Sequence, residues 1–199
     1  MRRCVKARLC YPFFMDLVSI LKKGGIGVMP TDTLYGLVGS ALVPETVERI
    51  YAVRKRDEGK PMIILISSQD DLKKFDVTIN EEEKKILEKI WPAKVSVILS
   101  CPSEKFSYLH RGTKTLAFRF PNDKKLQALL KETGPLVAPS ANPQGQEPAR
   151  TIEEAKKYFV GSTDFYEDGG TLDSLPSTLV SLKGGKLEVI REGAVNIQK

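Results

Sequence analysis

Four short segments place hydroxyl, amide or basic side chains directly beside apolar stretches, in the manner of ligand-binding loops. They are 30–37 (PTDTLYGL), 54–61 (RKRDEGKP), 115–120 (TLAFRF) and 138–143 (APSANP). The first offers threonine hydroxyls and backbone amides, and the second brings four cations into seven residues, which suits a polyphosphate. The third holds Arg119 within an apolar strand, where it needs an anionic partner. The fourth is a proline-stiffened loop with a hydroxyl and an amide, which suits recognition.

Each segment also has an ordinary structural interpretation. Residues 30–37 would form a simple strand–turn–strand, and 54–61 a solvated helix end whose cations face the carbonyl dipole. Arg119 would close a buried salt bridge, and 138–143 would be a structural turn. Ser177 and Arg191 lie at the edges of the last two expected strands and admit either role. The residues alone leave both interpretations open.

Several common kinds of catalytic site are missing from the sequence. It contains no GxxxxGK[ST], GxGxxG or GxSxG motif, and its one histidine, His110, lies in a polar stretch that we expect to be exposed. Cys4, Cys10 and Cys101 are odd in number and show no CxxC spacing, which argues against a disulfide scaffold and a zinc site. An enzyme built on this chain would work by positioning and charge neutralisation rather than by a protein nucleophile.

Composition narrows the class of protein further. The chain has 199 residues, 41% hydrophobic and 28% charged, with a net charge of +6 that favours anionic partners such as nucleotides or RNA. No apolar run approaches the roughly 18–20 residues that span a membrane. The N-terminus begins with basic residues, and Arg8 and Asp16 interrupt its apolar stretch, which argues against a signal peptide. We therefore expect an irregular arm over 1–13, with Met15 as an alternative start. We therefore predict a cytoplasmic protein with reduced thiols and no membrane partner.

Apolar periodicity and turn residues predict alternating helices and short strands. Helices are expected from Phe14 to Gly24, from Pro44, from Asn80, over 123–132 and from a Thr151–Glu154 capping box. Strands are expected at 27–29, 62–66, 95–99, 115–120, 136–138, 178–182 and 186–191. This alternation predicts one α/β domain over 1–199 with helices flanking a mixed sheet. The polar segments then lie at strand ends, where open α/β sheets bind ligands.

Taken in order, the motifs resemble one family. PTDTLYGL, RKR with a following KP, WP, LAFRFP, PSAN, PSTLV and IREG extend from about Gly27 to Gly193 in the pattern of YrdC/TsaC-type threonylcarbamoyl-AMP synthases, in the short form with one domain. The resemblance implies a twisted α/β sheet around a deep basic cleft. It also implies an enzyme that makes threonylcarbamoyl-AMP and pyrophosphate from L-threonine, bicarbonate and ATP, for threonylcarbamoyl-adenosine modification of tRNA by a downstream transferase complex.

The resemblance assigns binding roles to individual residues and no catalytic residue. The threonine-binding residues would be Thr33, Arg119, Ala138 and Ser177. The ATP-binding residues would be Arg54, Arg56, Lys60, Thr115, Ser140, Asn142 and Arg191. Mg²⁺ would accompany the phosphates, with no protein-built metal site and no zinc. The alternative is a non-catalytic module that binds tRNA or double-stranded RNA in the same basic cleft.

The sequence departs from the family pattern at four places. Arg54 replaces the first lysine of the usual KxR, which keeps the charge and changes the geometry. The usual WPGPxT is WPAKVS at 91–96, which predicts a changed path for that loop. Many relatives have a histidine where this chain has Leu65, and Asp32 is often glutamate. The missing histidine at Leu65 predicts a weaker or differently arranged threonine site, and the change at Asp32 is mild.

Overall fold

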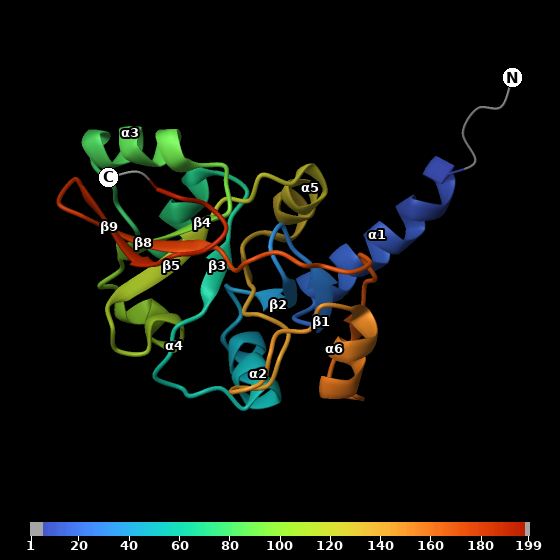
Figure 1. The fold of residues 1–199 in the computed structure, drawn as a ribbon. Coiled ribbons are helices and arrows are strands. Elements are labelled where there is room, and N and C mark those ends of the chain that lie inside the picture. Colours follow the sequence, from blue (N-terminus) through green and yellow to red (C-terminus); the bar gives the residue numbers. More distant parts are fainter. Residues whose placement is uncertain (1–5, 198–199) are drawn as a thin grey trace, which may run out of the picture.

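One mixed sheet forms the centre of the molecule (Figure 1). The computed structural model describes residues 6–197, with side chains from Phe14 onward. Strand order is β7-β1-β2-β6-β3-β5-β4-β8-β9, with β1–β7, β3–β5 and β4–β8 parallel and the other neighbours antiparallel. The strands are β1 Ile26–Pro30, β2 Tyr35–Ser40, β3 Ile63–Leu65, β4 Val95–Ser100, β5 Thr115–Arg119, β6 Leu136–Val137, β7 Phe165–Tyr166, β8 Thr178–Lys183 and β9 Lys186–Arg191. The predicted α/β class with a mixed sheet is confirmed.

Helices flank this sheet, and local capping defines several of their starts. They are α1 Lys6–Lys22, α2 Pro44–Arg54, α3 Glu81–Ile90, α4 Ser107–His110, α5 Lys124–Thr133 and α6 Ile152–Tyr158, with 3-10 turns η1 Gln69–Phe75 and η2 Glu104–Phe106. Asn80 and Glu83 form a reciprocal capping box at the start of α3. At α6 the box is only half formed, because the Glu154 carboxylate accepts from the Arg150 N–H instead of the Thr151 N–H.

The central strands are buried on both faces, which explains their continuous apolar sequences. In β2, Leu37 belongs to the larger apolar cluster and Val38 to the smaller one; in β3, Ile64 and Leu65 divide in the same way. The larger cluster includes residues of α2, α3 and α6, and the smaller one includes residues of α1 and α5. Alternation along each strand therefore fills two layers, and it fixes which residues of β3 and β5 face the site.

The prediction of an irregular arm over 1–13 is wrong for residues 6–13. The helix α1 begins at Lys6 and extends away from the sheet (Figure 1), while residues 1–5 lie outside the described part of the chain. Ala7, Arg8 and Leu9 have high helix propensity, so a helix anchored by the packed residues after Phe14 continues through them.

Candidate active site

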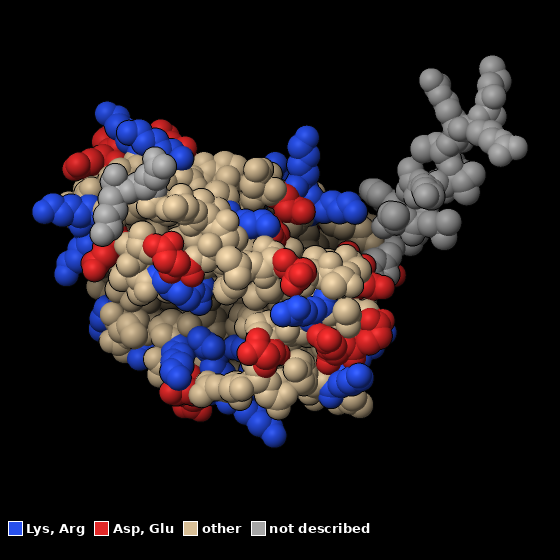
Figure 2. All heavy atoms as spheres, viewed as in Figure 1, with Lys and Arg blue, Asp and Glu red and all other residues tan. Residues whose placement is uncertain are grey.

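Two adjoining cavities open beside the ends of the central strands, and we name each after one of its arginines. The Arg119 cavity has a volume of about 240 Å³, and the Arg56 cavity about 390 Å³. They share a wall made of Ile63, Pro139, Ser140 and Arg191. Figure 2 shows a hollow on this side of the molecule, bordered by Lys and Arg side chains. Among the residues that line either cavity, the charged ones are Arg54, Arg56, Arg119 and Arg191.

The turn between β1 and β2 forms one side of the Arg119 cavity. Thr31 closes this turn, because its N–H and Oγ1 both donate to the Leu34 carbonyl, at 3.1 and 2.7 Å. The Thr33 hydroxyl lies 3.2 Å from Thr31 Oγ1, and both residues line the cavity. Gly36 bridges to Ser140 at the start of the 138–143 loop, which brings the two polar segments together. Local turn chemistry and one bridge thus join residues a hundred positions apart.

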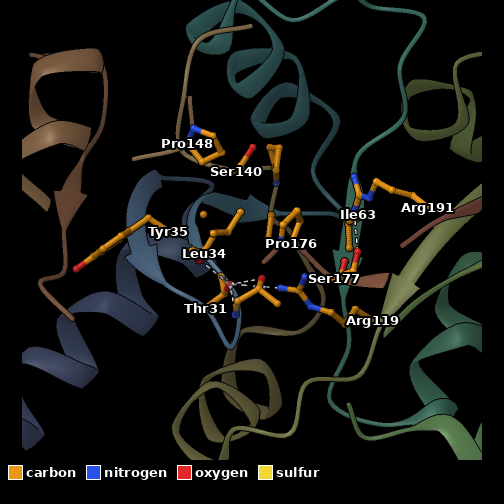
Figure 3. A pocket seen from close by; sticks show the side chains of 14 residues that line it. Thr31, Leu34, Tyr35, Ile63, Arg119, Ser140, Pro148, Pro176, Ser177 and Arg191 are labelled. Atoms are coloured by element: carbon orange, nitrogen blue, oxygen red, sulfur yellow. Dashed lines mark hydrogen bonds between the residues drawn. The ribbon is translucent and has the colours of Figure 1, made fainter. Parts of the chain in front are cut away.

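Arg119 lies deep in this cavity and is paired with Asp32. Its Nη2 is 3.0 Å from Asp32 Oδ1 and donates to Thr31 Oγ1 at 3.3 Å (Figure 3), and the side chains of Arg119 and Asp32 are each 4% exposed. Its buried Nε finds no partner in the described chain, and neither carboxylate oxygen of Asp32 accepts a well-aligned hydrogen bond there. Burial lowers the pKa of Arg119 and raises the pKa of Asp32, so each charge carries a desolvation cost that the pair only partly offsets.

Both interpretations of Arg119 therefore have structural support. It forms a buried ion pair, and it also lines a cavity, while its Nε is buried and without a partner in the described chain. Such an under-satisfied buried pair calls for an explanation, and a ligand carboxylate bound to the Arg119 guanidinium would supply one.

The opposite wall of the Arg119 cavity is formed by the segment that leads into β8. Pro176 and Ser177 line the cavity, and Ser177 Oγ lies 2.8 Å from Ser96 Oγ of β4, with both serines buried. Arg191 Nη2 donates to the Ser177 carbonyl at 2.8 Å (Figure 3). Within the WPAKVS loop, the Lys94 carbonyl accepts from the Thr178 N–H at 3.1 Å. This loop and Arg191 therefore fix the position of Ser177.

Arg54 is the most unusual cation in the Arg56 cavity, because it is 3% exposed and has no carboxylate within ion-pair distance in the described chain. Its Nε donates to the Asn142 carbonyl at 2.9 Å, and its Nη2 donates to Asn142 Oδ1 at 3.1 Å and to Ser140 Oγ at 3.3 Å. Its buried Nη1 has no partner. Burial and the nearby Arg56 lower the pKa of Arg54 to about 10, so it remains cationic at neutral pH.

Arg56 borders the same cavity and is held by backbone carbonyls. Its Nε donates to the Lys60 carbonyl at 2.9 Å and its Nη2 to the Pro61 carbonyl at 3.0 Å, while Tyr51 donates its hydroxyl to the Lys60 carbonyl. Arg111 stacks on the Tyr51 ring at 4.1 Å from its centroid, which supports the whole arrangement. Burial lowers the pKa of Arg56. The basic segment is thus the end of α2 and the loop that follows, in which Arg54 and Arg56 are held by the protein whereas Lys55 and Lys60 are exposed.

The structure brings most of the predicted residues to the two cavities. The Arg119 cavity is lined by Thr33, Arg119, Ala138 and Ser177, and the Arg56 cavity by Arg54, Arg56, Thr115, Ser140 and Arg191. Lys60 and Asn142 line neither cavity. The Lys60 side chain is 59% exposed and pairs with Asp57, and the Asn142 amide donates within its own loop to the Pro143 and Gln146 carbonyls. The roles of these residues in binding stay predictions.

Some lining residues carried no sequence signal. Ile63 lies in the shared wall, yet it looks like any other apolar strand residue, and Pro148 follows the recognised loop. Thr31, Tyr35 and Pro176 fall inside quoted motifs, so the order of the motifs could have identified them. The Tyr35 hydroxyl donates to the Gly170 carbonyl at 2.7 Å, which ties the β1–β2 turn to the segment between β7 and β8.

The expectation that His110 lies in an exposed stretch is wrong, because the residue is buried, with 1% of its surface exposed. Its Nδ1 accepts from the Gly112 N–H at 3.1 Å, so the polar sequence around it forms a turn that folds over the ring. It lines neither cavity. Within the described residues, no group of three or more His, Cys, Asp or Glu could hold a metal ion, and no helix is long and apolar enough to cross a membrane.

Comparison with known proteins identifies the family. The Sua5/YciO/YrdC family model, described as telomere recombination, matches residues 19–193. The chain belongs to the Sua5/YciO/YrdC family. It is 30% identical to a Methanocaldococcus jannaschii protein provisionally named threonylcarbamoyl-AMP synthase. The similar region has 188 residues and covers 92% of this chain and 88% of that protein. The resemblance seen in the motifs is confirmed, and the name of this relative agrees with the predicted enzyme class.

Solved structures of the Sua5/YciO/YrdC family share this fold. Pyrococcus abyssi Sua5 complexed with L-threonine matches with a TM-score of 0.82 at 27% identity, over 90% of this chain and 54% of that one. Escherichia coli YciO matches with a TM-score of 0.82 at 26% identity, over 93% of this chain and 91% of that one. The chain therefore spans about half of the Sua5 protein and nearly all of YciO.

Proposed function

We propose that this chain is an L-threonylcarbamoyladenylate synthase, which makes threonylcarbamoyl-AMP and pyrophosphate from L-threonine, bicarbonate and ATP. The observation that carries the proposal is the pair of adjoining cavities, one small with a buried arginine and one larger with several arginines. A reaction that joins an amino acid to a nucleotide needs two such sites with a common wall. The names of relatives across most of the chain support the same activity.

Threonine would occupy the Arg119 cavity with its carboxylate on the guanidinium of Arg119. The hydroxyls of Thr33 and Ser177 would meet its polar groups, and Ala138 would contact its side chain. The P. abyssi structure complexed with L-threonine supports an amino-acid site in this fold. An arginine that already holds an internal carboxylate at one nitrogen and offers another is suited to orient a second carboxylate.

ATP would occupy the Arg56 cavity with its phosphates on Arg54, Arg56 and Arg191, while Thr115 and Ser140 offer hydroxyls. No carboxylate lines this cavity, so the residues present offer no ligand set for a resident metal ion. They are compatible with Mg²⁺ that enters bound to phosphate oxygens, which would help to neutralise the charge of the nucleotide.

The chemistry would take place at the shared wall. Bicarbonate and the threonine amine form a carbamate with loss of water, and a carbamate oxygen attacks the α-phosphorus of ATP. The bond to the β-phosphate oxygen then breaks, and pyrophosphate leaves with the electron pair. Arginine side chains would stabilise the charge on the leaving group, and the chain would contribute orientation rather than a nucleophile. The product would pass to a downstream transferase complex that modifies adenosine in tRNA.

The test is pyrophosphate release with each substrate omitted in turn. We expect release only when ATP, threonine and bicarbonate are all present, together with a threonylcarbamoyl-AMP product detected by mass spectrometry. Equal release without threonine would refute the synthase proposal. Binding of double-stranded RNA without affinity for free threonine would favour the non-catalytic alternative, because a module for RNA alone has no need of a small cavity with a buried arginine.

A further inference from the structure

The residues that follow β9 fold back onto the segment Pro176–Thr178. The Ala194 N–H donates to the Pro176 carbonyl at 2.8 Å, and Thr178 Oγ1 both donates to the Val195 carbonyl and accepts from the Val195 N–H. In Figure 1 the segment between β7 and β8, drawn in orange, crosses the front of the molecule before it reaches this place. The end of the chain therefore holds the last residues of that crossing against the sheet.

Gly193 is the point of closest approach in this contact. A Cβ added there would lie 2.3 Å from the Pro176 carbonyl oxygen, 2.6 Å from the Ser177 carbonyl carbon and 2.6 Å from the Thr178 nitrogen. All three are backbone atoms, so no side-chain rotation could relieve the clash. Gly193 does not have a positive φ, and therefore glycine is required here by space rather than by backbone conformation.

The segment that Gly193 touches carries part of the Arg119 cavity. Pro176 and Ser177 line that cavity, and the Ser177 hydroxyl is set against Ser96 Oγ at 2.8 Å. A methyl group at position 193 would push the Pro176–Ser177 backbone, and it would break the fit of two hydroxyls that are both buried in a densely packed region. The Arg56 cavity contains neither residue and meets the displaced backbone through Arg191, whose Nη2 donates to the Ser177 carbonyl, so the nucleotide side should be affected less.

We propose that Gly193 is a positioning residue for threonine, whose missing side chain sets how deeply Pro176 and Ser177 reach into the Arg119 cavity. The inference rests on the proposed function, because it assigns the Arg119 cavity to the amino acid. It is distinct from a general role in stability, since it predicts a loss of binding that is larger for threonine than for ATP.

The test compares Gly193→Ala with Val195→Ala in the full chain, using pyrophosphate release with threonine and ATP titrated separately. Val195→Ala removes partly buried packing from the same segment but leaves its backbone contacts with Thr178 in place. We expect Gly193→Ala to raise the KM for threonine by about three- to tenfold, the loss of one neutral hydrogen bond, with a clearly smaller rise in the KM for ATP. Val195→Ala should lower the melting temperature and leave both KM values unchanged.

Each other outcome has a definite meaning. A folded Gly193→Ala protein with normal threonine KM, an equal rise in both KM values, or failure of the variant to fold would each overturn the positioning role, the last because it would assign the contact to stability. Calorimetric titration of threonine into the two variants and wild type gives the same comparison without turnover. Wild-type protein that shows no threonine-dependent release would refute the proposed function itself, which separates the two failures.

Discussion

Replacing Arg119 by lysine separates the structural role of this residue from its role in binding. The substitution keeps a cation beside Asp32 but removes the forked guanidinium. In the structure the Arg119 Nη2 pairs with Asp32 and donates to Thr31, and the buried Nε has no partner in the described chain. A lysine ammonium could keep its place near Asp32, but one nitrogen could not also meet a threonine carboxylate with two parallel hydrogen bonds.

The structure sets the size of each effect. Losing one charge-assisted hydrogen bond to the ligand costs about 1.5–3 kcal/mol, which corresponds to about ten- to a hundredfold weaker threonine binding. Folding loses the hydrogen bond from the Arg119 guanidinium to Thr31, which is charge-assisted but long at 3.3 Å, so we expect its loss to cost at most about 1.5 kcal/mol. For a domain of this length that lowers the melting temperature by a few degrees. The expected loss in binding therefore exceeds the loss in stability.

Calorimetric titration of threonine and thermal melting of the same samples measure the two losses. Arg49→Lys is the control, because Arg49 also pairs with a carboxylate but lines neither cavity. Its Nη1 and Nη2 donate to the two carboxylate oxygens of Asp164 at 2.7 and 3.1 Å. It should lower stability slightly and leave threonine binding unchanged. If Arg119→Lys melts several degrees lower and binds threonine normally, Arg119 is a structural arginine and the proposed threonine site is wrong.

Two further predictions concern the neighbouring charges. Arg56→Ala should weaken ATP binding by about ten- to a hundredfold in calorimetry. Lys60→Ala should weaken it less, because the exposed Lys60 side chain lines neither cavity; equal losses would contradict this ranking. Burial raises the pKa of Asp71, but hydrogen bonds from Lys74 and Ser67 outweigh burial and hold it below the ordinary 3.8. The Asp71 carboxylate therefore stabilises the fold above about pH 4 and loses this contribution as the pH falls. Asp71→Asn should lower the melting temperature at pH 7 but much less at pH 3. An equal difference in melting temperature from wild type at both pH values would refute the assignment.

Sequence patterns predicted those parts of the site that depend on local chemistry. Apolar, β-branched runs located the central strands, and Asn80 with Glu83 located the start of α3 by a rule that involves four residues. The motifs at strand ends did converge, since Thr33 and Ser140 come from loops that the Gly36–Ser140 bridge brings together. Alternation along β5 was also enough to place Arg119 on one face of its strand.

Contacts between distant parts of the chain were beyond sequence reasoning. β7 has only two residues and exists because Gly27 and Val28 offer it an edge, which no local pattern reveals. The pairing of Asp32 with Arg119 joins two motifs that each looked like a ligand-binding element, and nothing in either one indicates the other as its partner. The need for glycine at 193 likewise arises from backbone atoms that belong to another segment.

The departure from the family pattern at position 54 has a physical explanation in this long-range structure. The Arg54 guanidinium uses Nε and Nη2 to hold Asn142 and Ser140, and its own carbonyl accepts from the Gln144 N–H at 2.9 Å. Its third nitrogen, Nη1, is buried and has no partner in the described chain, while the residue lines the Arg56 cavity. A lysine has a single ammonium and could not support the loop at two atoms while it also faced a phosphate. Because that loop also lines the Arg119 cavity through Ala138 and Ser140, the arginine at 54 links the expected nucleotide site to the wall of the expected threonine site.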